Sequence, residues 1–184
     1  MTDMPAQVHE FDWPDRVVIG TVGRPGARTF YLQARTGAQI VSIALEKQQS
    51  ALLAQKIDEI LDQLSTVEGN RYSVPASTPV ELVDNDPLET VHEQFRAGAL
   101  GIGWDPTTAQ VIIEATPLPT DDDLLDGSGD AEEESEMLRV RMPVGTARAF
   151  TQRTREVVDA GRPFCTLCGY PMDPDGHTCT LPEI

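Results

Sequence analysis

All three cysteines of the chain lie within its last twenty residues, and their spacing strongly constrains what this part of the chain can form. Cys165 and Cys168 make a C-x-x-C pair, which bends the backbone so that both thiolates can lie about 2.3 Å from one zinc ion. His177 and Cys179 follow after a segment rich in turn-forming residues. Three thiolates and one imidazole complete a tetrahedral, structural set of ligands. We therefore predict that Cys165, Cys168, His177 and Cys179 bind one zinc ion.

Another interpretation of these cysteines stays open. A C-x-x-C pair can be a redox pair, although such pairs usually lie between a strand and the start of a helix. Here Pro163 precedes the pair and two further soft ligands follow it. A disulfide framework is disfavoured because three cysteines leave one thiol over. Zinc is therefore preferred, with a redox or reactive thiol as the alternative.

The charge of the chain bears on its partners. Thirty acidic residues against fourteen basic ones give a formal net charge of −16 at pH 7. A surface this negative repels nucleic-acid phosphates and anionic membranes. The sequence has no apolar run long enough for a transmembrane helix and no signal peptide at its start. Together with cysteines in metal spacing, these features predict a cytoplasmic protein.

Hydrophobic periodicity predicts the elements of the first half of the chain. A short edge strand is expected within residues 6–16, and β-branched or alternating runs predict strands over 16–22, 29–35 and 39–45. A helix follows, closed by Gly69-Asn70, and residues 70–88 contain the prolines of a connecting loop. The buried stripe of that helix consists of Leu53, Ile57, Ile60, Leu61 and Leu64.

The same pattern recurs from about residue 90. Strands are expected over 94–104, 110–115 and 137–142, and a helix over 146–160. We predict an α+β fold in which two β-β-β-α halves, about 6–69 and 90–162, form one antiparallel sheet with both helices on one face. Residues 1–162 would form this domain, and residues 163–184 the zinc-binding tail.

An acidic segment interrupts the second half. Nine of the thirty acidic residues fall between Asp121 and Glu136. Low hydrophobicity and like charge predict a disordered loop over residues 120–136. A solvated insertion is the simpler interpretation, and a docking segment for a basic partner is the alternative.

Candidate catalytic residues are few. His9 and His92 have no partners near them in the sequence, and no nucleotide-binding or hydrolase motif is present. Glu114 is expected to face solvent or to pair with an arginine. Arginines gather in the second half, at Arg139, Arg141, Arg148, Arg153 and Arg155. An enzyme acting on a phosphorylated metabolite would need His9 or His92 to converge with these arginines in one cleft.

Two stretches carry a resemblance to a known family. The first is Glu10-Phe-Asp-Trp-Pro-Asp-Arg16 with its glycine-rich continuation to Arg28. In the tail, the matching positions are Phe164, Cys165, Leu167, Cys168, Gly169, Pro171, Asp173, Pro174, Gly176, His177 and Cys179. Over its full length the chain resembles a family of actinobacterial proteins of unknown function. Thr166 stands where that family usually has proline, a departure that touches no ligand.

Members of that family are often encoded beside a histidine-phosphatase-like protein and a lipid-kinase-like protein. The resemblance therefore implies a shared pathway, with a product of such a neighbouring gene as a candidate partner. It supports the zinc site and supplies no activity.

The favoured function is that of a non-catalytic, zinc-stabilised protein that acts through contacts with another protein. An enzyme acting on a phosphorylated metabolite is the alternative, and nucleic-acid binding through the zinc tail is the least favoured.

Replacing one predicted zinc ligand tests the metal site. Cys168→Ser is expected to lose the zinc and to unfold the tail, because three ligands cannot close a structural site, while the sheet remains folded. Elemental analysis and thermal unfolding of the variant check both parts. Zinc retained at wild-type stoichiometry would contradict the assignment.

Overall fold

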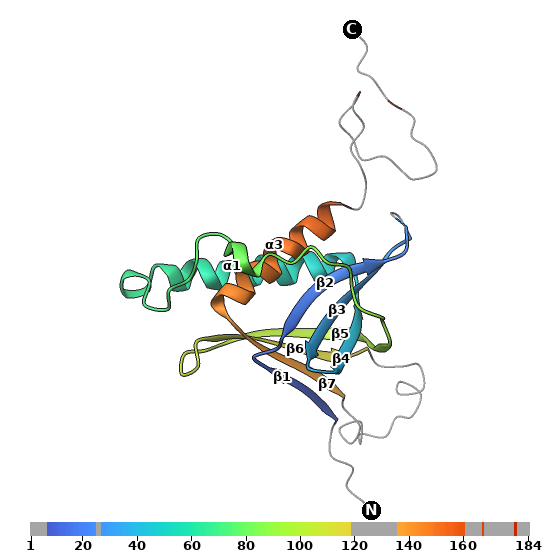
Figure 1. Cartoon of the computed structure of the whole chain (residues 1–184), viewed down its shortest axis with the longest axis horizontal. Helices are drawn as coiled ribbons and strands as arrows, with labels where there is room; N and C mark the ends of the chain where they lie inside the picture. Colours follow the sequence, from blue (N-terminus) through green and yellow to red (C-terminus); the bar gives the residue numbers. More distant parts are fainter. Residues whose placement is uncertain (1–6, 25–26, 119–135, 161–166, 168–178, 180–184) are drawn as a thin grey trace, which may run out of the picture.

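The computed structural model describes residues 7–24, 27–118 and 136–160, together with Leu167 and Cys179 (Figure 1). The acidic loop predicted to be disordered lies outside the described residues except for Glu136. Most of the predicted zinc-binding tail also lies outside them.

The described chain forms an α+β structure, as predicted. Its element order is one short strand followed by β-β-β-α twice. A connector, residues 70–92, joins the two groups. The elements are β1 (Val8–Asp12), β2 (Arg16–Val22), β3 (Thr29–Thr36), β4 (Gln39–Leu45), α1 (Lys47–Ser65), the short 3₁₀ helices η1 (Val67–Gly69) and η2 (Val80–Leu82), β5 (Glu93–Asp105), β6 (Gln110–Pro117), β7 (Met137–Pro143) and α3 (Val144–Asp159).

The sheet is mixed, so the prediction of an antiparallel sheet is wrong at two places. The seven strands lie in the order β1-β7-β6-β5-β4-β3-β2. Neighbours joined directly along the chain are antiparallel, whereas β4 pairs with β5 and β1 with β7 in parallel. The crossover through α1 returns the chain to the same end of the sheet before β5 begins, which makes β4 and β5 parallel. Alternation of apolar residues gives a strand its two faces but not its direction.

The two edge strands of this sheet are consecutive in the chain. In a flat sheet of seven strands they would lie about 29 Å apart. The four-residue step from Asp12 to Arg16 can span at most about 15 Å. The backbone N–H of Trp13 donates to the Arg141 carbonyl of β7 (3.1 Å), and that of Asp15 donates to the Arg35 carbonyl of β3 (2.8 Å). The sheet must therefore curve until its edges meet, and β1 and β2 act as one broken strand.

β5 is broken in a similar way. Its first residues pair in parallel with β4, ending at Arg96, and from Ala97 onward it pairs antiparallel with β6. The register shifts between Ala97 and Ala99, at Gly98, whereas the break between β1 and β2 lies at Trp13, whose φ is 55°. Each half of the barrel-like sheet therefore begins with a strand that leaves one neighbour and joins another.

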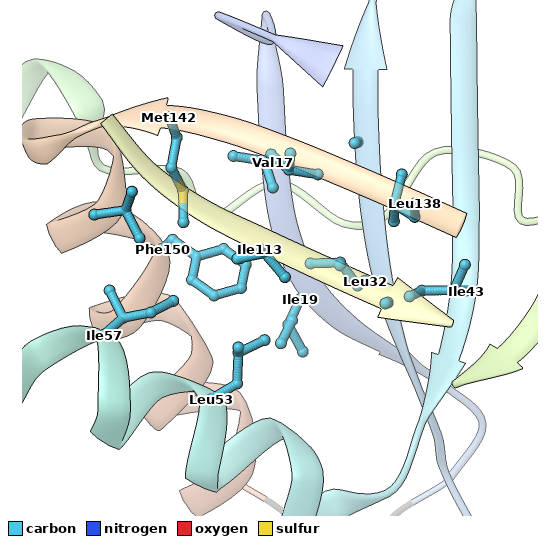
Figure 2. Packing of buried hydrophobic residues seen from close by; sticks show 14 of the residues in the cluster. Val17, Ile19, Leu32, Ile43, Leu53, Ile57, Ile113, Leu138, Met142 and Phe150 are labelled. Atoms are coloured by element: carbon cyan, nitrogen blue, oxygen red, sulfur yellow. The ribbon is translucent and has the colours of Figure 1, made fainter. Parts of the chain in front are cut away.

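One hydrophobic core fills the concave side of the sheet. The helices contribute Leu53, Ile57 and Leu61 from α1 and Phe150 from α3, each no more than 2% exposed. Figure 2 shows side chains of both helices pointing toward side chains of the sheet. Each strand contributes its inward side chains, namely Phe11, Val17, Ile19, Phe30, Leu32, Ala34, Val41, Ile43, Leu45, Phe95, Ala97, Val111, Ile113, Ala115, Leu138, Val140 and Met142.

Within the described part of the chain, neither helix combines the length and the apolar character needed to cross a membrane.

The connector crosses the outer side of the first half. Leu88 lies directly over Gly20 of β2, so close that an added Cβ would meet the Leu88 Cγ at 2.5 Å. The buried Gln33 side chain accepts a hydrogen bond from the Glu89 backbone N–H (2.9 Å) and donates to the Glu89 carbonyl oxygen (3.1 Å). These contacts fix the segment that leads into β5.

A methyl group at Gly20 should disturb this contact. Gly20→Ala is expected to lower the free energy of unfolding by about 1–3 kcal/mol, because the Leu88 side chain must move. Denaturant unfolding measures the loss, and adding Leu88→Ala should restore part of it. Gly101→Ala is the matched control, since its nearest neighbouring atoms are 4.0 Å away. Equal effects of Gly20→Ala and Gly101→Ala would show that Leu88 does not pack there.

Candidate functional site

The predicted zinc ligands fall mostly outside the described structure. Cys165, Cys168 and His177 are not among the described residues, whereas Cys179 is and is half-buried. In the described part of the chain, no three histidine, cysteine, aspartate or glutamate side chains are placed to hold a metal ion. The zinc site remains a prediction from the spacing of its ligands.

The two candidate catalytic histidines lie apart from the arginines. His9 points to the inner side of β1, where its Nε2 lies 2.8 Å from the Glu136 Oε1. Arg139 and Arg141 are on the outer side of the adjacent β7, because side chains alternate along a strand. His92 is exposed in the connector. The cleft that the enzyme hypothesis needs is not formed by these residues.

The arginines of β7 pair with carboxylates on the outer surface of the sheet. Arg139 Nε donates to Glu114 Oε1 (3.0 Å), so of the two alternatives expected for Glu114, solvent or an arginine, it takes the arginine. Arg141 Nη1 donates to Asp105 Oδ2 (3.1 Å), and its Nε lies 3.7 Å from Glu10. Glu114 and Glu10 lie on the two strands beside β7, and Asp105 ends β5, two strands away, so each arginine has a carboxylate partner within the described part of the chain.

Two arginines of α3 join the helices. Asp58 of α1 is buried, and it accepts hydrogen bonds from Arg148 Nη1 (2.8 Å) and the Thr151 hydroxyl (2.8 Å) and forms an ion pair with Arg155. Arg148 also donates from its Nε to the Pro75 carbonyl (3.0 Å). A buried carboxylate paired in this way holds α1, α3 and the connector together.

Asp84 of the connector lies between two further arginines. Arg16 donates to both carboxylate oxygens of Asp84 (2.7 and 3.1 Å), and Arg153 donates to its Oδ1 (3.3 Å) and its carbonyl (2.7 Å). Hydrogen bonding from Arg16 is the main cause that lowers the pKa of Asp84. Burial lowers the pKa of Arg153. This cluster of Asp84, Arg16 and Arg153 fastens the connector to β2 and α3. A crevice of about 100 Å³ adjoins it.

A much larger groove of about 570 Å³ lies between α1 and β5. Leu52 of α1 is 53% exposed although it lines this groove. The β5–β6 hairpin extends beneath α1 (Figure 1). The groove is lined on the α1 side by Gln49, Leu52, Leu53, Lys56, Glu59, Ile60 and Gln63 and on the β5 side by Gly98, Leu100 and Ile102. The floor is thus apolar and the rim carries amides and charges.

The groove is made by a second stripe of α1. Leu53, Ile57 and Leu61 face the core, as predicted, whereas Leu52 and Ile60 lie on the adjacent side of the helix with the polar lining residues. The hydrophobic periodicity predicts Ile60 in the buried stripe and does not include Leu52, whereas the structure places both beside the groove. Two adjacent leucines were the available signal, because neighbours on a helix point about 100° apart and cannot share one narrow stripe.

A comparison with protein families finds one match. The family model described as "Protein of unknown function (DUF3090)" matches residues 9–179, which is nearly the whole chain. No curated protein and no solved structure matches the chain.

The Asp84 cluster predicts a pH-dependent loss of stability. A carboxylate whose pKa is lowered in the folded state contributes stability that is complete above its unfolded value near 3.8 and is lost as the pH falls toward the folded value. Asp84→Asn should lower the free energy of unfolding by about 2 kcal/mol at pH 7, since two arginines lose their carboxylate partner. Chemical denaturation between pH 7 and pH 3 measures the difference, which should shrink below about pH 4.

Asp86→Asn is the control for this measurement. It removes the same charge from an exposed side chain two residues after Asp84. It should change stability by no more than about 0.5 kcal/mol. A constant difference between wild type and Asp84→Asn across this pH range would contradict the role given to the Asp84 carboxylate.

Proposed function

This chain belongs to the DUF3090 family of proteins of unknown function, and we propose that it acts as a protein-binding module through the groove between α1 and β5. The observation that carries the proposal is the pair of apolar walls, in which Leu52 is half-exposed and Ile60, Leu100 and Ile102 are only partly buried. An exposed apolar groove with a polar rim is typical of an interaction site.

The energetics favour a ligand that covers these side chains. Complete burial of one leucine or isoleucine side chain stabilises a complex by about 1.5–3 kcal/mol relative to full exposure. The groove offers several such side chains that are already partly covered, so each contributes less. Part of the gain offsets the entropy lost on association. The expected affinity is therefore modest, in the micromolar range of about −8 kcal/mol.

The charged groups of the described structure support binding rather than catalysis. Arg139, Arg141, Arg148 and Arg153 each bond a carboxylate of the same chain, and these pairs fasten strands, helices and the connector. The net charge of −16 favours partners that are basic outside their apolar contact segment. In this proposal the zinc ion held by Cys165, Cys168, His177 and Cys179 keeps the tail folded and takes no part in chemistry.

Substitution of Leu52 tests the binding site. Leu52→Lys should lower the affinity for groove ligands at least about tenfold, because it places a charge on the apolar wall. Its effect on folding should stay within about 0.5 kcal/mol, since the position is half-exposed and lysine is a good helix former. The ligands are selected from a displayed library of random ten-residue peptides, and their affinities are measured by fluorescence anisotropy.

Ala51→Lys is the matched control, because it adds the same charge to the same helical turn at an exposed position that does not line the groove. It should leave the affinities unchanged. Peptides that bind wild type and Leu52→Lys equally well would show that the groove is not the binding site.

A further inference from the structure

One edge of β5 beside the groove has no neighbouring strand. β4 pairs with β5 only as far as Arg96. From Ala97 to Asp105, β6 is the only described strand that pairs with β5. Backbone N–H and C=O groups of alternate residues point to opposite edges of a strand. Every second residue of this stretch therefore turns its backbone groups toward the edge opposite β6.

The Ala97 carbonyl shows how such a group is satisfied where the helix is close. Gln49 lies in the first turn of α1, and its Nε2 donates to this carbonyl at 3.2 Å. Among the described backbone hydrogen bonds outside regular elements, none involves residues from Gly98 to Asp105. The open edge therefore runs along the groove beyond Gln49.

The other half of the sheet contains the equivalent edge in a closed form. In the first half the chain pairs with β7 along β1 and then with β3 along β2, much as β5 pairs first with β4 and then only with β6. The helix α3 lies against β2, and α1 lies beside β5. On β2, the Ile19 carbonyl accepts a hydrogen bond from Arg153 Nε (3.0 Å), and Phe150 is buried. The remaining crevice there has about 100 Å³, against about 570 Å³ beside β5. The space between helix and strand edge is thus mostly filled in the first half and open in the second.

Resting on the proposed function, we infer that the groove binds its partner by strand addition to the open edge of β5. The ligand is an extended segment of another protein with apolar side chains at alternate positions and basic residues at its ends. Its backbone pairs with β5 between Gly98 and Asp105, while alternate side chains enter the groove between α1 and β5.

The dimensions of the groove fit such a segment. Its α1 wall runs from Gln49 to Gln63, and the helix rises about 21 Å between these two residues. About six residues of extended chain span that length at 3.3–3.4 Å each. Two or three of their side chains would contact Leu52, Ile60 and Ile102. The outward side of β5 carries Ala99 and Gly101, so the ligand's remaining side chains meet no bulky neighbours.

Charge selects the source of the segment. Near the groove, Glu59 pairs with Lys56 (3.4 Å) and Glu46 with Arg96 (2.7 Å), so the charge that selects a ligand is the net −16 of the whole chain. A basic flank is therefore attracted to the binding surface. A second copy of this chain would bring another −16 to the interface and be repelled. The occupant is accordingly a different protein.

Amide hydrogen exchange distinguishes strand addition from other ways of filling the groove. The probe is a synthetic peptide with three valines alternating with two threonines and flanked by two lysines at each end, added to the full chain. Alternate amides of β5 between Gly98 and Asp105 should exchange at least about tenfold more slowly when it is bound. N-methylation of the peptide on the edge that faces β5 should abolish binding, whereas N-methylation on its other edge should not, because only the first set donates hydrogen bonds.

Leu52→Lys and Ala51→Lys separate the inference from the proposed function. Binding that Leu52→Lys weakens without any protection of β5 amides would overturn strand addition and leave the groove as the binding site. Binding that is insensitive to Leu52→Lys would overturn the site itself. No binding of this peptide up to about 1 mM would overturn the inference, because backbone pairing tolerates many sequences. Protection that grows with protein concentration in the absence of peptide would identify a second copy as the occupant and overturn it as well.

Discussion

The fold depends on a three-residue link that joins opposite edges of one sheet. Trp13 bonds to β7 and Asp15 to β3, so the chain itself holds the two edges within a short distance. Because seven strands must then curve around one interior, their inward side chains form a single core with α1 and α3. The positions of both helices, and hence of the spaces beside them, follow from this closure.

Closure also explains why strand edges are exposed to the helices. β1 and β2 share one place in the sheet, and β5 changes neighbour at Gly98, so each half has a stretch of strand with only one strand beside it. α3 and Arg153 cover that stretch on β2. Beside β5, α1 turns Leu53, Ile57 and Leu61 to the core and leaves the groove of about 570 Å³ between itself and the strand.

Paired charges in the described structure serve mainly to fasten its parts. Asp58 joins the helices, Asp84 joins the connector to β2 and α3, and Glu114 pairs with a neighbouring strand. An ion pair that is already satisfied has little to offer a charged ligand, because binding must first replace a good internal partner. Apolar surface has no such competition, which is why the proposed function rests on the groove rather than on the arginines.

The sequence by itself determined the positions of most strands and both helices, because periods of 2 and 3.6 residues record which side of each element is buried. For Glu114 it left solvent and an arginine as alternatives, and it predicts the zinc ligands by their spacing alone. Only the tertiary structure decided the parallel pairing of β1 with β7, the meeting of the two sheet edges at Trp13, and the partial exposure of the Leu52 side chain. Local patterns fix the face of an element, whereas its neighbours depend on contacts between segments far apart in the chain, whose free energies no local pattern records.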